Sequence, residues 1–138
     1  MSDELSASPV ERDELAVLFI RTPDDPEQFG PAFQRLEELV GTRGRKFYGA
    51  FYPGKNEYRA CVVTQDGDDA NALGLEAGTL PGGRYLRTRL HGEPPELYGR
   101  IAPTFEKLMA LAAADSTRPS IEFYRRHDEL DLFLPIAD

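Results

Sequence analysis

The chain closes with Ser120-Ile121-Glu122-Phe123-Tyr124, a short polar turn, and then Leu130-Asp131-Leu132-Phe133-Leu134-Pro135-Ile136. Two apolar and aromatic runs around a turn predict a β-hairpin. Because side chains alternate along a strand, Ile121 and Phe123 share one face and Glu122 and Tyr124 share the other. An acid beside an aromatic hydroxyl, backed by an apolar face, is typical of a cavity lining. Glu122 is therefore our main candidate for a functional residue, the alternative being an exposed hairpin glutamate.

Working outward from this hairpin, the chain divides into two halves with the same order of elements. The first half predicts a strand over 14–21, a helix from Pro26 to about Val40 capped by Asp25, and strands over 45–52 and 57–65. The second half predicts a strand over 84–90, a helix after Pro95 that breaks near Pro103, and the closing hairpin. We expect a flexible N-terminus over 1–10 and one domain over 11–138, with repeat one at about 13–65, a linker over 66–79 and repeat two at about 80–137.

This order predicts an α+β fold of two β-α-β-β repeats. The repeats would form a curved antiparallel sheet with the helices on one side and a pocket between the repeats. Phe29 and Phe33 on the first helix, and Phe105 and Met109 on the second, recur at helical spacing and are expected in the core.

Composition excludes several classes of protein. The chain has 138 residues and a net charge of −8, which disfavours binding to a phosphate backbone. It has no run near the roughly 20 apolar residues of a membrane span and no signal-peptide pattern, so we expect a cytoplasmic protein. The single cysteine, Cys61, is expected to be a packed thiol, and neither His91 nor His127 has metal-ligand spacing. We therefore expect no metal and no cofactor.

Several segments together resemble the GyrI-like domain, also called the AraC-type effector-binding or SOUL-like small-molecule-binding domain. They are Leu80-Pro-Gly-Gly-Arg-Tyr85, His91-Gly-Glu-Pro-Pro95, Tyr58-Arg-Ala-Cys-Val-Val63, and Ile121–Tyr124 followed by Leu132–Ile136. The resemblance covers about 13–137.

The resemblance implies two β-α-β-β repeats with a pocket between them for apolar, often cationic or aromatic, small molecules. The acid of the Ile-Glu-x-Tyr pattern lies in that pocket in this family, and here it is Glu122. By position, the resemblance also implies Tyr124 and either Tyr48 or Phe51 as aromatic partners, and we add Tyr85 to the expected ligand-binding residues. Many members carry a DNA-binding helix-turn-helix, but this chain resembles the stand-alone, short gyrase-inhibitory type.

Three functions follow from these expectations. The first is a bacterial, multidrug-type protein that binds hydrophobic or cationic xenobiotics without contacting nucleic acid or membrane. The second is a small hydrolase of strained, cyclopropanoid toxins, an activity implied by the resemblance, with Glu122 as general base. The third is a protein-interaction module such as a gyrase inhibitor, whose protein partner the sequence does not name.

Overall fold

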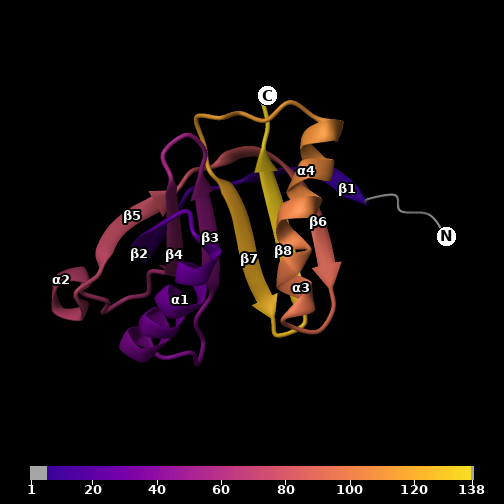
Figure 1. Cartoon of the computed structure of the whole chain (residues 1–138). Helices are drawn as coiled ribbons and strands as arrows, with labels where there is room; N and C mark the ends of the chain where they lie inside the picture. Colours follow the sequence, from indigo (N-terminus) through magenta and orange to yellow (C-terminus); the bar gives the residue numbers. More distant parts are fainter. Residues whose placement is uncertain (1–5, 138) are drawn as a thin grey trace.

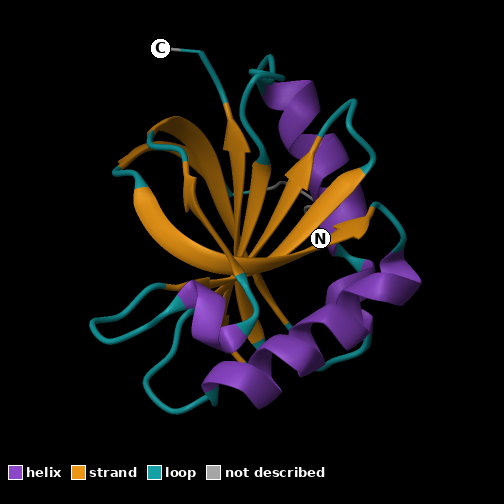
Figure 2. Cartoon of the chain, turned by 90° about the vertical axis from the view of Figure 1, so that its left-hand side faces the viewer, coloured by secondary structure: helices purple, strands orange, loops and turns teal. Residues whose placement is uncertain are grey.

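The computed structural model describes residues 6–137. Their fold is α+β, with one open antiparallel sheet of eight strands in the order β1-β6-β8-β7-β3-β4-β2-β5. Figure 1 shows α1 and α3–α4 on either side of β7, and Figure 2 shows the curvature of the sheet. The elements follow one another as β1 (Ala7–Arg12), β2 (Leu15–Pro23), α1 (Pro26–Val40), β3 (Phe47–Tyr52), β4 (Glu57–Val63), α2 (Ala70–Leu73), β5 (Glu76–Leu80), β6 (Gly83–His91), α3 (Glu96–Gly99), α4 (Ile101–Leu111), β7 (Ser120–Arg126) and β8 (Glu129–Pro135).

The helix boundaries follow from local chemistry that the sequence displays. The Asp25 side chain accepts a hydrogen bond from the Glu27 amide at the start of α1, and Gly41, with a φ of 77°, ends the helix. In the second half the helix breaks after Gly99, and Pro103 falls in the first turn of α4. A proline clashes with the carbonyl four residues earlier, here that of Gly99, so one continuous helix is disfavoured. These predictions are confirmed.

Two edge strands differ from the expectation. The expected flexible segment over 1–10 contains the start of β1, which pairs with β6 from Ala7 onward. Residues 1–5 lie outside the described part of the chain. The expected linker over 66–79 contains α2 and β5, and β5 pairs with β2. Both edge strands are largely exposed, so their sequences lack the apolar alternation that reveals a half-buried strand. The order β-α-β-β occurs twice, each time preceded by one of these strands.

These edge strands link the two halves. β1 precedes the first β-α-β-β run but pairs with β6 of the second, and β5 precedes the second run but pairs with β2 of the first. The β1–β2 and β5–β6 links therefore both pass between the halves. They meet at Gly82, where an added Cβ would lie only 2.8 Å from the Arg12 carbonyl oxygen.

Strand register shows which residues lie under the helices. Residues directly opposite one another on antiparallel strands have side chains on the same face. One such row crosses four strands through Leu132, Glu122, Gly49 and Ala60. At its ends, Leu132 packs in a cluster with Leu108 of α4, and Ala60 packs in a cluster with Leu36 of α1. The two long helices thus cover the same face of the sheet, and Glu122 and Gly49 lie between them.

The other face of the sheet forms a separate core. Its buried members include Tyr48, Tyr85, Ile121 and Phe133, with Phe123 packed against them. The alternation expected for the closing hairpin is therefore confirmed, since Ile121 and Phe123 lie on the face opposite Glu122.

Candidate functional site

A buried carboxylate lies in the middle of the sheet. Glu122 is 8% exposed, and its Oε1 accepts a hydrogen bond from the Tyr58 hydroxyl and another from the Tyr124 hydroxyl, each 2.8 Å long. Tyr124 reaches Glu122 because two residues on one strand share a face, whereas Tyr58 reaches it from β4, across β3.

Gly49 makes that reach possible. It lies on β3 between the two strands, opposite both Glu122 and Ala60. A Cβ at this position would lie 2.0 Å from the Tyr58 hydroxyl oxygen and 2.5 Å from Glu122 Oε1. Any larger residue would therefore occupy the space in which the hydroxyl meets the carboxylate.

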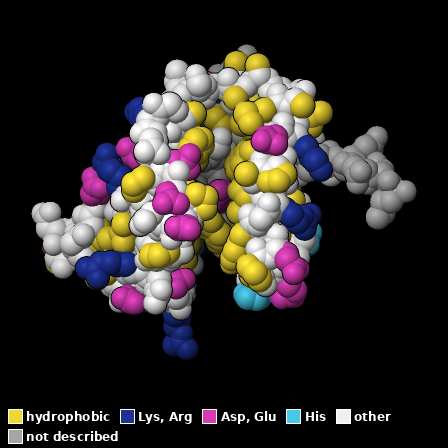
Figure 3. Space-filling view, in the orientation of Figure 1, with side chains coloured by type: hydrophobic (Ala, Val, Ile, Leu, Met, Phe, Trp, Pro, Cys, Tyr) yellow, Lys and Arg dark blue, Asp and Glu magenta, His cyan; other side chains and the backbone are white. Residues whose placement is uncertain are grey.

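Aromatic rings surround this carboxylate. The Phe29 ring stacks on Tyr58 with centroids 3.7 Å apart, and the Phe33 ring meets Tyr124 edge-on at 4.9 Å. From α3, the Tyr98 ring approaches Tyr124 at 6.2 Å and is 45% exposed. The surface is hollowed between α1 and α3–α4, with hydrophobic side chains on both sides (Figure 3). We call this hollow the groove, with the sheet around Glu122 as its floor and the two helices as its walls.

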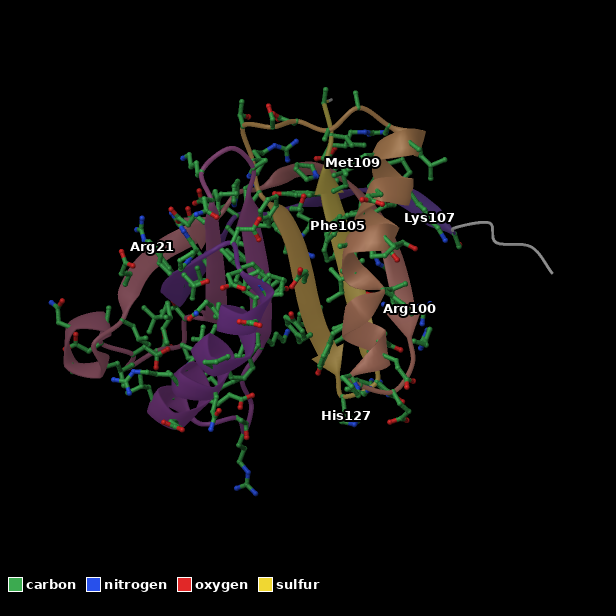
Figure 4. All side chains as sticks on the ribbon, viewed as in Figure 1. Arg21, Arg100, Phe105, Lys107, Met109 and His127 are labelled. Atoms are coloured by element: carbon green, nitrogen blue, oxygen red, sulfur yellow. The ribbon has the colours of Figure 1, made fainter. Side chains whose placement is uncertain are left out.

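The α4 wall is also apolar on the side toward β7. Figure 4 shows Phe105 and Met109 on that side of the helix, and Lys107 and Arg100 on the other. Phe105 is half-buried and Met109 is 50% exposed. The prediction that these helix residues lie in the core holds in part, since Phe33 and Phe105 pack against the buried clusters under their helices. Met109 is exposed instead, and Phe29 is only half-buried, because helical spacing does not reveal that both helices border a groove.

The electrostatics of the site are dominated by burial. Burial raises the pKa of Glu122 above its ordinary value, and the hydrogen bonds from Tyr58 and Tyr124 partly oppose this rise. Burial and the adjacent carboxylate raise the pKa of both tyrosines, so both hydroxyls remain donors. Among residues 6–137 no Lys, Arg or His forms an ion pair with Glu122, and its side-chain hydrogen-bond partners are the two tyrosines.

The expected ligand-binding residues fall into two groups. Glu122 and Tyr124 lie together at the groove, and Phe51 lies on the same face, opposite Tyr58 and Ser120. Tyr48 and Tyr85 instead lie in the core of the opposite face. The Tyr48 hydroxyl accepts a hydrogen bond from Arg12, and the Tyr85 hydroxyl donates one to the Pro81 carbonyl. The structure thus does not bring Tyr48 or Tyr85 to Glu122.

Sequence reasoning missed Tyr58, Phe29, Phe33 and Tyr98. Tyr58 lies near the start of a strand that the sequence predicts, but its partner depends on register across β3 rather than on local pattern. Glycine at position 49, within a strand whose other residues are four aromatics and Ala50, was the available signal, since an interior strand glycine often marks a close approach.

A separate pocket lies where β3 begins and β7 ends. Its volume is about 300 Å³, and its lining is Arg45, Lys46, Phe123, Tyr124, Arg125 and Arg126. Four of these side chains are cationic and none is acidic. We assign the candidate site to the groove because the groove carries the buried carboxylate, and because the only lining residue of this pocket that hydrogen-bonds that carboxylate is Tyr124.

Three findings on the described residues concern metal binding, thiol chemistry and membrane spans. Residues 6–137 contain no group of three His, Cys, Asp or Glu side chains placed to hold a metal ion. Burial raises the pKa of the Cys61 thiol to about 12, so it is a packed thiol rather than a nucleophile. No helix over these residues combines the length and the hydropathy needed to cross a membrane.

The fold is shared with several solved structures. No family model and no curated protein matches the sequence. An integron cassette protein from the mobile metagenome of Vibrio cholerae is similar at a TM-score of 0.77 and 15% identity, over 95% of both chains. The protein SAV2435, solved with bound tetraphenylphosphonium, is similar at 0.70 and 12%, over 96% of this chain and 94% of that one. The C-terminal domain of EcmrR is similar at 0.66 and 14%, over 97% and 98%. At these identities the likeness establishes a common fold.

Proposed function

We propose that this chain is a small-molecule-binding protein of the GyrI-like, effector-binding type, whose groove binds hydrophobic cations. The observation that carries the proposal is Glu122, a buried carboxylate with two phenol donors and no ion-pair partner among the described residues. The fold shared with a tetraphenylphosphonium-bound protein supports the same ligand chemistry.

The energetics favour a cation over a neutral ligand. A desolvated, unpaired carboxylate is costly, and an arriving cation offsets that cost. The Tyr124, Phe33 and Tyr98 rings add cation–π attraction of about 0.5–2 kcal/mol each. Apolar groups of the ligand contribute about 25 cal/mol for each Å² that they bury against the walls. The charge of Glu122 thus selects cationic ligands, and the side chains of the two helices select among them by shape.

The test uses two ions of nearly the same shape and opposite charge, tetraphenylphosphonium and tetraphenylborate, followed by calorimetry and thermal shift. We expect the phosphonium to bind and stabilise the wild type, with affinity reduced at least tenfold in Glu122→Gln. The control is Glu57→Gln, which removes the same charge from the residue before Tyr58, on the opposite face of β4. Equal binding of both ions, or phosphonium binding unchanged in Glu122→Gln, would overturn the proposal.

A hydrolase is the second candidate, because a glutamate with a raised pKa beside two phenols has the character of a general base. It predicts that a bound electrophile is consumed over time by the wild type and not by Glu122→Gln. Chromatography of the ligand after incubation separates the two functions, since a binding protein returns the ligand unchanged.

A further inference from the structure

The two oxygens of the Glu122 carboxylate have different surroundings. Both the Tyr58 and the Tyr124 hydroxyls donate to Oε1. Oε2 accepts no hydrogen bond from any described residue, and the causes of the shifted Glu122 pKa include no donor other than these two hydroxyls.

Oε2 is open to the groove. Every buried side-chain nitrogen or oxygen in residues 6–137 has a hydrogen-bond partner. Since Oε2 has none, it is not fully enclosed, and it contributes to the 8% of Glu122 that remains exposed. The tyrosines thus hold the carboxylate by one oxygen and leave the other as an unused acceptor.

We propose that the preferred ligand carries its positive charge on an N–H group, as in a protonated aliphatic amine attached to aromatic rings. This inference rests on the proposed function and specifies its ligand class. A protonated amine donates a charge-assisted hydrogen bond to Oε2 and satisfies the acceptor that it desolvates. A quaternary ammonium or phosphonium offers charge alone and leaves Oε2 covered and unpaired, which is costly.

The groove accommodates the rest of such a ligand. Phe33 and Tyr98 both meet Tyr124 edge-on, from α1 and α3 respectively. Aryl groups on either side of the amine would therefore contact both walls while the N–H reaches the floor. The pocket at the ends of β3 and β7 does not offer this arrangement, because its charged side chains are all donors.

The test compares 1-methyl-4-benzhydrylpiperidine, protonated at neutral pH, with its N,N-dimethyl quaternary salt. The two ligands have the same charge, and an N–H in one is replaced by N–CH3 in the other. We expect the protonated amine to bind the wild type about ten- to a hundredfold more tightly by calorimetry, the range that a charge-assisted hydrogen bond provides. Equal affinities, or tighter binding of the quaternary salt, would overturn the inference.

Variants separate this inference from the function on which it rests. In Glu122→Gln the two hydroxyls keep the amide oxygen at the Oε1 position, so the NH2 group takes the Oε2 position and the preference for N–H should disappear. Tyr124→Phe removes one donor from Oε1 but leaves Oε2 free, so the preference should persist. If both ligands bind equally and both lose affinity in Glu122→Gln, the inference fails and the function stands. If neither ligand depends on Glu122, the function fails as well.

Discussion

Replacing Gly49 with alanine tests the geometry of the site most directly. The new methyl carbon would lie 2.0 Å from the Tyr58 hydroxyl oxygen, 2.8 Å from Tyr58 Cζ and 2.5 Å from Glu122 Oε1. Tyr58 is 1% exposed and stacks on Phe29, so its ring has little room to retreat. Overpacking costs about 1–3 kcal/mol and a lost hydrogen bond to a charged group about 1.5–3 kcal/mol. The Tyr58 hydroxyl can avoid the new methyl group only by giving up its hydrogen bond to Glu122, so the two costs overlap. We therefore expect the free energy of unfolding to fall by about 2–4 kcal/mol.

Urea denaturation measures this loss as a change in the free energy of unfolding. Gly30→Ala is the matched control, because Gly30 lies in the interior of α1 and the added Cβ would meet no atom within 4 Å from outside its own helix backbone and its chain neighbours. This control should change the free energy of unfolding by less than about 1 kcal/mol, because the gain in helix propensity is opposed by the restriction that Pro31 places on the residue before it. A double-mutant cycle with Tyr58→Phe, which deletes the clashing hydroxyl, should make Gly49→Ala less costly. A Gly49→Ala variant as stable as the wild type, or one whose cost is the same in the Tyr58→Phe background, would refute the role given to Gly49.

Three further predictions concern charged groups. The free energy of unfolding of the wild type should fall as the pH rises from about 4.5, the ordinary pKa of Glu122, through its raised native pKa, because the native state binds the extra proton in this window. Denaturation of Glu122→Gln across the same pH range should lack this fall. Arg12→Ala should cost about 1–2 kcal/mol in urea denaturation, since the guanidinium lies 4.1 Å from the Phe133 ring centroid and donates to the Tyr48 hydroxyl; an unchanged midpoint would contradict this. Asp68→Asn should cost about 1 kcal/mol at neutral pH by losing the Arg45 ion pair. Because the pKa of Asp68 is lowered from 3.8 to about 2, its contribution should be lost as the pH falls through that lowered value.

The sequence predicts the elements of this fold better than their pairing. Helix caps such as Asp25 and breakers such as Pro103 act locally, and the structure follows both. The alternation from Ile121 to Tyr124 is equally local, and it correctly predicts that Glu122 and Tyr124 share one face of their strand. Strand β1, with Pro9 near its middle, carries too few buried side chains to be recognised, because an edge strand is held mainly by its backbone.

The geometry of the candidate site was predictable in part for the same reason. Glu122 and Tyr124 are two residues apart, so their contact is a local property of one strand. The contact between Tyr58 and Glu122 spans 64 positions and exists only because Gly49 separates them on the intervening strand. Tyr48 is one residue from that glycine and therefore faces the other side of the sheet. A shift of one residue in register reverses every such assignment.

If the groove binds ligands as proposed, the contact of the two links at Gly82 limits how the protein can adapt to ligands of different sizes. Separating the two halves between β3 and β7 would stretch the β1–β2 and β5–β6 links. It would therefore break the pairing of β1 with β6 and of β5 with β2. The pairing of these strands therefore resists separation of the two halves, so the position of Glu122 in the sheet stays fixed. We therefore expect the groove to change its width through movement of the aromatic side chains of α1 and of α3 relative to α4. The helix is interrupted at Arg100, where such a movement needs the least distortion. The width of the proposed binding site would thus depend on the two helices, while the sheet keeps its carboxylate in place.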